Sequence, residues 1–263
     1  MVFRTEGGLR EKGMERALAS PPHESESERA RTADLMRLTP AGYKSVLDAG
    51  ARKGYYSRLL TERFETVTAL DLNPLNPANM DGIGCVQGDL TRLPFPDNSF
   101  DVVFCSEVLE HVPKLEQACS EIVRVTRHKA LIGVPYRQDI RLGRTSCGNC
   151  HRTNPPWGHV NSFDEKKLET LFTPLRVVER SFVWSDDEHT SALATWLMDR
   201  GGNPWGVYDS QEPCGHCGAK LSPPASTSAL QRLSAASASA LNRIQGWFTK
   251  PHANWIHLVL EKK

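Results

Sequence analysis

The sequence has no excess of charge of either sign. Its 263 residues include 32 lysines and arginines and 31 aspartates and glutamates, which leave a formal net charge of +1. Proteins that bind nucleic acid generally present a basic surface to the phosphates. The balanced composition therefore argues against nucleic acid as a partner, although it leaves room for a local basic patch.

Long apolar runs are also missing. No stretch approaches the ~20 apolar residues that a transmembrane helix needs, and no apolar run follows the first eight residues as it would in a secretory signal peptide. We therefore expect no membrane span and a cytoplasmic location. Hydrophobic residues still make up 39% of the chain, enough for the core of one α/β domain with insertions.

The chain is organised around a turn bounded by two glycines. A buried strand is predicted over residues 46–49, and Gly50 and Gly54 enclose the turn that follows it. Ligands of open α/β sheets bind where the carboxyl end of a strand meets such a turn, and glycine lets backbone approach a ligand because it has no Cβ. Asp48, Gly50 and Gly54 are therefore candidate binding residues.

The turn lacks the fingerprint of dinucleotide-binding proteins. That fingerprint reads Gly-x-Gly-x-x-Gly, whereas Gly50 and Gly54 are four residues apart and Tyr55 stands in place of the third glycine. NAD is therefore a poor match. A strand predicted over residues 66–71 ends in Asp71, near the ~20-residue separation from the first glycine at which a carboxylate reaches ribose hydroxyls. The alternative role of Asp71 is to cap the next turn.

Strands and helices alternate along the first half of the chain, which implies βαβ units and a parallel sheet. After Pro135 the regular alternation ends, and we expect residues 185–224 to be irregular. The predicted strands are 46–49, 66–71, 84–86, 101–105, 131–134, 175–184 and 255–260, and the predicted helices are 54–64, 107–126, 163–172 and 226–248.

A longer motif follows the third predicted strand. Asp89 and Leu90 come directly after Gly88, and residues 93–101 read Leu-Pro-Phe-Pro-Asp-Asn-Ser-Phe-Asp. Together with the acidic residue and glycines of the first turn, this motif resembles the small-molecule branch of the class I S-adenosylmethionine (SAM) methyltransferases, called type 11. The resemblance covers roughly residues 44–184 and the last strand. It departs from the family at Arg52, which replaces the middle glycine of the first motif.

The resemblance implies both a fold and a cofactor. The implied fold is an α/β, Rossmann-like sheet of seven strands, mostly parallel with the last strand antiparallel, with helices on both faces. In the family the aspartate that matches Asp89 bonds the adenine amino group, and Leu90 flanks the ring. The implied SAM-binding residues are Asp48, Gly50, Gly54, Asp71, Leu72, Asp89, Leu90, Cys105 and Ser106.

Methyl transfer from SAM depends mainly on alignment of the acceptor, the methyl group and the sulfur. A general base is needed only for a hydroxyl or a protonated amine, and the candidates are His111, His159 and Tyr136. His111 lies four residues after Glu107 on a predicted helix, so the pair has the alternative role of ordering the start of that helix. His159 has the alternative role of anchoring its loop.

Two Cys-Gly-x-Cys pairs lie in the irregular segments of the sequence, Cys147 with Cys150 and Cys214 with Cys217. Four thiolates suit a tetrahedral structural zinc, whereas disulfides are disfavoured in a chain with no export signal. Haem attachment, a redox pair and an iron–sulfur cluster are the rival uses. We expect zinc to clamp the loop after the fifth strand to a zinc-binding insertion and to shape the acceptor pocket.

These features predict three parts: residues 1–44 as an N-terminal lid or flexible segment, residues 45–184 with 255–263 as the SAM-binding core, and residues 185–254 as an insertion. The predicted function is methyl transfer to an oxygen or nitrogen of a small-molecule, sugar, lipid or peptide intermediate by a monomer or homodimer. The alternatives are an RNA or protein methyltransferase, and a non-catalytic scaffold with the same fold, for which Arg52 is the argument.

Overall fold

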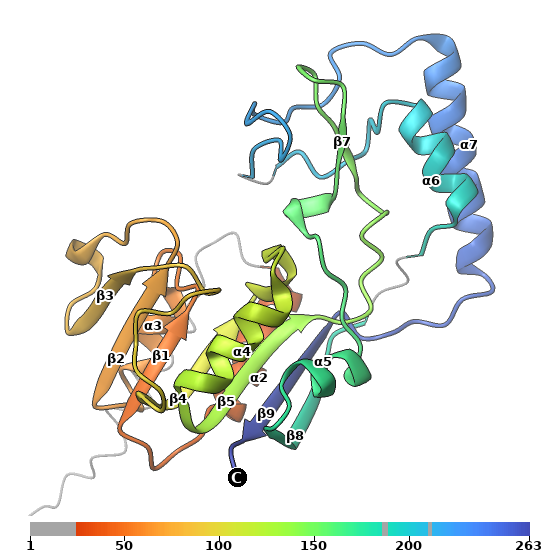
Figure 1. Cartoon of the computed structure of the whole chain (residues 1–263). Coiled ribbons are helices and arrows are strands. Elements are labelled where there is room, and N and C mark those ends of the chain that lie inside the picture. Colours follow the sequence, from red (N-terminus) through yellow and green to blue (C-terminus); the bar gives the residue numbers. More distant parts are fainter. Residues whose placement is uncertain (1–24, 186–188, 210–211) are drawn as a thin grey trace, which may run out of the picture.

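Seven strands form a single sheet in the order β3-β2-β1-β4-β5-β9-β8. The computed structural model describes residues 25–185, 189–209 and 212–263 (Figure 1). β9 runs antiparallel to both of its neighbours, and the pairs from β3 to β5 are parallel. The predicted α/β fold is confirmed. The strands are β1 (Ser45–Ala49), β2 (Thr66–Asp71), β3 (Ile83–Gln87), β4 (Phe100–Ser106), β5 (Thr126–Pro135), β8 (Arg176–Val183) and β9 (Trp255–Glu261).

Each face of the sheet has its own hydrophobic core, because successive side chains of a strand point to opposite faces. In β4, Val103 and Cys105 belong to one core, and Val102 and Phe104 belong to the other. A strand that is covered on both faces needs such a continuous apolar run. The helices α4 (Leu115–Val125) and α5 (Glu165–Leu171) cover the first face, and α2 (Glu26–Leu38) and α3 (Tyr55–Leu60) cover the second.

A capping box starts helix α2. The Ser25 hydroxyl accepts a hydrogen bond from the Glu28 N–H at 3.2 Å, and the Glu28 carboxylate accepts one from the Ser25 N–H at 3.3 Å. Such caps satisfy N–H groups that lack a partner within the helix. Asp34 then fastens the helix to β9, because its Oδ2 lies 2.7 Å from Nδ1 of the fully buried His257.

The glycines of the first turn are required by its shape. Gly50 has a φ of +89°, and a Cβ there would lie 2.2 Å from Cγ2 of Val108. Gly54 has a φ of +72°, and a Cβ there would lie 2.0 Å from Cε of Met80. Both positions therefore disfavour larger residues on conformation, and at Gly50 the β-branched Val108 also leaves no space for one. Arg52 between them also has a positive φ, of 50°, and its side chain is largely exposed.

The helix predicted over residues 107–126 is wrong in its first third. Glu107 has a φ of +58°, the 3-10 turn η2 spans Leu109–His111, and α4 begins only at Leu115. A positive φ breaks a right-handed helix, and Pro113 disfavours helical backbone at the residue before it. The chain therefore folds back over the end of β4 before the helix starts.

The part of the insertion between β8 and β9 contains more helix than we predicted. The helix α6 (Ala192–Arg200) lies within residues expected to be irregular, and it packs against α7 (Ala229–Gly246), which was predicted over 226–248. Figure 1 shows the two helices side by side, outside the sheet. Only Ala194 and Thr195 of α6 are buried. A helix that buries so few side chains has no clear apolar face in its sequence, so the sequence pattern did not predict it.

The loop between β5 and α5 contains a two-stranded ribbon of β6 (Thr145–Ser146) and β7 (Thr153–Asn154). In the described part of the chain, no helix has the length and apolar character to cross a membrane. Residues 1–24 of the predicted N-terminal lid or flexible segment lie outside the described residues.

Candidate cofactor site and metal centre

A cavity of about 760 Å³ opens at the carboxyl ends of β1, β4 and β5. Pockets for small molecules and cofactors typically enclose ~300–1,000 Å³, so its volume suits such a ligand. The first glycine turn contributes to its wall, as do α2 and the loop after β5. The wall of the cavity includes polar and titratable side chains from these segments, among them Arg31, Arg52, Ser106, His111, Tyr136 and His159.

Asp71 ends β2 beside this cavity and is held by backbone amides. Its Oδ2 accepts a hydrogen bond from the Arg52 N–H at 2.8 Å, and its Oδ1 accepts one from the Asn73 N–H at 2.9 Å. A carboxylate oxygen accepts more than one hydrogen bond, so both oxygens keep capacity for a ligand. Leu72, the next residue, is 68% exposed.

Asp48 lies beneath the glycine turn and not in its mouth. Its side chain is 2% exposed, and its Oδ2 accepts a hydrogen bond from the Ser57 hydroxyl at 2.5 Å. Burial raises the pKa of the Asp48 carboxyl to about 6, and the nearby charge of Asp71 acts in the same direction. Asp48 therefore supports the turn from below in this structure.

This raised pKa predicts how stability depends on pH. The folded state binds the Asp48 proton more tightly than the unfolded state, whose pKa is near 3.8. Wild-type stability relative to Asp48→Asn should therefore rise as the pH falls from above 6 to below 4. At about 1.4 kcal/mol per pKa unit, the rise is about 3 kcal/mol.

Urea unfolding of both proteins at pH 8 and pH 4.5 measures this difference. A stability gap between wild type and Asp48→Asn that is equal at the two pH values would show that the carboxyl has an ordinary pKa.

The predicted adenine contacts behave differently from each other. Asp89 is exposed, and its Oδ1 accepts hydrogen bonds from both the N–H and the hydroxyl of Thr91 at 2.8 Å. Leu90 is 7% exposed and belongs to the hydrophobic core. The described wall of the cavity does not include Asp71, Leu72, Asp89 or Leu90.

At the end of β4 the two predicted cofactor contacts point to opposite environments. Cys105 is fully buried in the core, and burial raises the pKa of its thiol well above the usual value. Ser106 lines the cavity, and its buried Oγ has no hydrogen-bond partner among the described residues. A buried hydroxyl without a partner is unusual, so Ser106 fits a ligand at this wall.

Glu107 joins the end of β4 to α2 and β9. Its Oε2 accepts a hydrogen bond from Nη1 of Arg31 at 2.8 Å and another from Nε1 of Trp255 at 3.3 Å. The Arg31 guanidinium also lies over the Trp255 ring, 5.1 Å from its centroid. This network positions α2 as one wall of the cavity.

The structure brings the two candidate histidines together. The ring centroids of His111 and His159 are 4.7 Å apart, and Nδ1 of His159 lies 2.6 Å from Oε1 of Gln138. Burial lowers the pKa of both imidazoles, that of His159 to about 3. Tyr136 lines the same cavity, and burial raises its pKa.

Sequence reasoning missed Glu110. It is fully buried, and neither carboxylate oxygen has a hydrogen-bond partner in the part of the chain that the structure describes. Burial and the nearby Glu107 raise its pKa well above the usual range. The signal available in the sequence was the density of titratable residues after β4, where Glu107, Glu110 and His111 fall within five positions.

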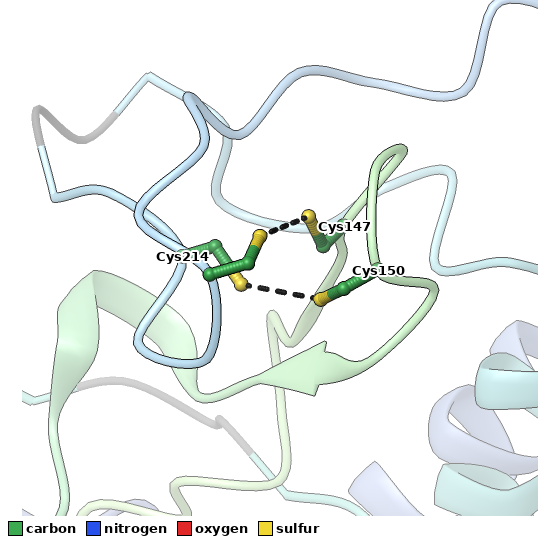
Figure 2. Close-up of side chains that lie close together, drawn as sticks. Cys147, Cys150 and Cys214 are labelled. Carbon is green, nitrogen blue, oxygen red and sulfur yellow. Dashed lines mark hydrogen bonds between the residues drawn. The ribbon is translucent and has the colours of Figure 1, made fainter.

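The four predicted metal ligands converge although two of them come from a distant segment. Sγ of Cys147 lies 3.6 Å from Sγ of Cys217, and Sγ of Cys150 lies 3.6 Å from Sγ of Cys214. Figure 2 shows the thiols facing one another between the β6–β7 ribbon and the loop that carries Cys214. A disulfide needs ~2.05 Å, whereas ~2.3 Å zinc–sulfur bonds in a tetrahedron place sulfurs about 3.8 Å apart. The spacing fits a tetrahedral metal.

Each cysteine pair is built into a tight backbone turn. The His151 N–H bonds the Cys147 carbonyl at 3.0 Å, and the Gly218 N–H bonds the Cys214 carbonyl at 2.8 Å. Glu212, which precedes the turn of Cys214 by two residues, lines the cavity. Its Oε1 lies 3.6 Å from Nη2 of Arg52. The cysteine cluster and the glycine turn are thus connected through one ion pair.

Residues 47–133 match the family model of the type 11 methyltransferase domain. This third of the chain is similar to a methyltransferase domain. The match covers β1 through most of β5, which are the strands that carry the glycine turn, Asp71, Asp89 and the Glu107–His111 segment.

Curated proteins that are similar to this chain include two malonyl-[acyl-carrier protein] O-methyltransferases. The protein of Serratia marcescens is 39% identical over 156 residues, which are 58% of this chain and 57% of that protein. The protein of Salmonella typhimurium is 27% identical over 183 residues, 67% of this chain and 68% of that protein. The chain spans about half the length of the first curated relatives it matches.

Solved structures share the fold of this chain. A putative methyltransferase from Bacillus halodurans superimposes with a TM-score of 0.55 at 14% identity and covers 88% of this chain and 97% of its own. The [4+2]-cyclase SpnF superimposes with a TM-score of 0.52 at 16% identity, over 93% of this chain and 84% of its own. The cyclase shows that likeness of fold does not decide the reaction.

Proposed function

We propose that this protein transfers the methyl group of SAM to an oxygen or nitrogen atom of a small molecule or biosynthetic intermediate. The observation that carries the proposal is the cavity at the strand ends, whose wall includes the glycine turn and the unpartnered hydroxyl of Ser106. The O-methyltransferase names of the curated relatives support an oxygen acceptor.

The residues at the strand ends fit the parts of the cofactor. Asp71 would accept hydrogen bonds from the ribose hydroxyls, with Leu72 beside the nucleoside and Asp89 at the adenine amino group. Gly50 and Gly54 would keep the turn close to the cofactor, and Asp48 would support it from below. When bound, SAM supplies a methyl group that its sulfonium sulfur already activates.

The acceptor would occupy the cavity beside Ser106, between the glycine turn and the loop after β5. Of the three candidate bases that line it, His159 has a pKa of about 3 and Tyr136 a raised one. An efficient general base has a pKa near the working pH, so these two groups are better suited to holding the acceptor than to removing its proton unaided. The segment before β1, including α2, would cover the cavity as a lid.

We also propose a structural zinc at Cys147, Cys150, Cys214 and Cys217. The four thiols supply the donor set of such sites, and their 3.6 Å separations suit it. Zinc would cross-link the β6–β7 ribbon to the loop that carries Glu212. Through the ion pair between Glu212 and Arg52, the zinc-bound segment would fix one wall of the acceptor cavity.

Isothermal titration of the purified chain with S-adenosylhomocysteine tests the central proposal. We expect one site per chain with a dissociation constant in the micromolar range, about −8 kcal/mol. If neither S-adenosylhomocysteine nor SAM binds at millimolar concentration, the chain is a non-catalytic scaffold with a methyltransferase fold.

A further inference from the structure

The most unusual group near the cavity is the carboxylate of Glu110, which lies beside two histidines of the cavity wall. Its exposure is 0%, and both oxygens lack a hydrogen-bond partner within the described residues. Buried polar atoms are nearly always paired with protein or water, and a buried charge without compensation is strongly unfavourable. Protonation would remove the charge but would leave a buried O–H group that also needs an acceptor. Glu110 therefore calls for a partner that the described residues do not provide.

Two imidazoles surround this carboxylate. A carboxylate oxygen of Glu110 and one ring nitrogen each of His111 and His159 all lie within 4.8 Å of one another. In the described structure no hydrogen bond joins these three side chains directly, although their polar atoms lie close together. Carboxylate and imidazole together are a common donor set for divalent transition metals.

The second nitrogen of His159 is already engaged. Its Nδ1 lies 2.6 Å from Oε1 of Gln138, and an amide oxygen can only accept a hydrogen bond. Nδ1 therefore carries the proton, and Nε2 carries the lone pair. Histidines that bind metals donate their other N–H to a carbonyl or carboxylate in this way, which fixes the ring and its tautomer.

The charges beside the cluster also favour a bound cation, because two carboxylates lie near one arginine. Glu107 and Glu110 contribute two carboxylates within one turn of chain, and Arg31 is bonded to Oε2 of Glu107. The other oxygen of Glu107 is buried and, among the described residues, has no partner. A divalent cation beside Glu110 would compensate the remaining negative charge.

We propose that Glu110, His111 and His159 bind a divalent metal ion in the wall of the cavity, at a site distinct from the four cysteines. Two imidazoles and one carboxylate leave coordination positions open. Because His111 and His159 line the cavity, those positions face the space assigned to the acceptor. Resting on the proposed function, the metal would bind an acceptor oxygen and lower the pKa of its hydroxyl.

Manganese titration followed by electron paramagnetic resonance tests the site without any methyl transfer. The protein is first loaded with one equivalent of zinc, which four thiolates bind in preference to two imidazoles and a carboxylate, so that the second site stays open to Mn²⁺. We expect one Mn²⁺ per chain for the wild type and loss of that binding in Glu110→Gln. Gln138→Leu should weaken binding about 10- to 100-fold, because it removes only the partner of His159.

The control is His252→Gln, which changes an imidazole of the same cavity that lies outside the cluster and should bind Mn²⁺ as the wild type does. Thermal melts check folding: Mn²⁺ should raise the melting temperature of the wild type and not that of Glu110→Gln. If the wild type binds no Mn²⁺ at millimolar concentration, or if Glu110→Gln binds it equally well, the site does not exist. Titration with S-adenosylhomocysteine remains a separate test, so failure of one proposal leaves the other measurable.

Discussion

Cys214→Ser should release the metal and unfold the segment that the four cysteines hold together. Structural zinc contributes about 10–16 kcal/mol of apparent binding energy in small zinc-finger peptides, and here the buried side chains near the four thiols are few. The hydrophobic cluster at this centre contains one fully aliphatic buried residue, Leu221, besides Cys147 and Cys214. Without metal, so small a core is insufficient to order the two loops.

Metal analysis and hydrogen exchange measure this outcome together. Wild-type protein should carry zinc at the cysteine centre, and Cys214→Ser should lose it while the amides of residues 145–154 and 212–221 exchange faster. The sheet should keep its protection, because its two cores lie elsewhere.

Cys85→Ser is the matched control, since Cys85 lies in β3 and outside the cluster; it should keep both the metal and the protection. Native wild-type protein that contains no metal and whose four thiols all react freely would exclude the zinc centre.

The cysteine centre illustrates how far spacing alone carries a prediction. Each Cys-Gly-x-Cys pair indicates a metal-binding turn by itself. That the two distant pairs share one metal was predicted from the donor set, whereas the way in which they meet depends on the path of the β6–β7 ribbon and of the loop after α6. The donor set was therefore predictable, and its geometry was not.

Local signals sufficed for the sheet and its first turn. The apolar run of β4 predicts a strand covered on both faces, and Gly50 and Gly54 predict a turn that other residues cannot adopt. These signals depend only on neighbouring residues. The strand limits differ from the prediction mainly at β5, which begins at Thr126 and not at residue 131. Residues 127–129 are basic and partly exposed, so they lack the apolar pattern that predicts a strand.

The Glu110 cluster could not be predicted because a nonlocal feature determines it. A helix over residues 107–126 would place Glu107 and His111 on one face and Glu110 beside them at its surface. The positive φ of Glu107 instead turns the chain inward, so that Glu110 is buried next to His159 from a loop after β5. Asp48, a predicted cofactor contact, is buried for a simpler reason. It lies in a strand whose last four residues are all buried.

The second large effect concerns Asp71. Asp71→Asn should weaken binding of S-adenosylhomocysteine by roughly 100-fold or more, because hydrogen bonds to a charged group contribute about 1.5–3 kcal/mol each and two ribose hydroxyls are involved. The variant also places an amide NH₂ against one of the N–H groups of Arg52 and Asn73. Isothermal titration measures the loss in affinity, and Asp97→Asn, an exposed carboxylate at the far end of the sheet, should bind normally.

A comparison of ligands separates loss of the ribose contact from distortion of the turn. Wild-type protein should bind the 2′-deoxy analogue of S-adenosylhomocysteine more weakly than the parent compound, because one hydroxyl is missing. Asp71→Asn should discriminate far less between the two, since the carboxylate that detects the hydroxyl is gone. If the variant loses affinity but still discriminates as the wild type does, Asp71 acts only through the backbone of the glycine turn, and the ribose lies elsewhere.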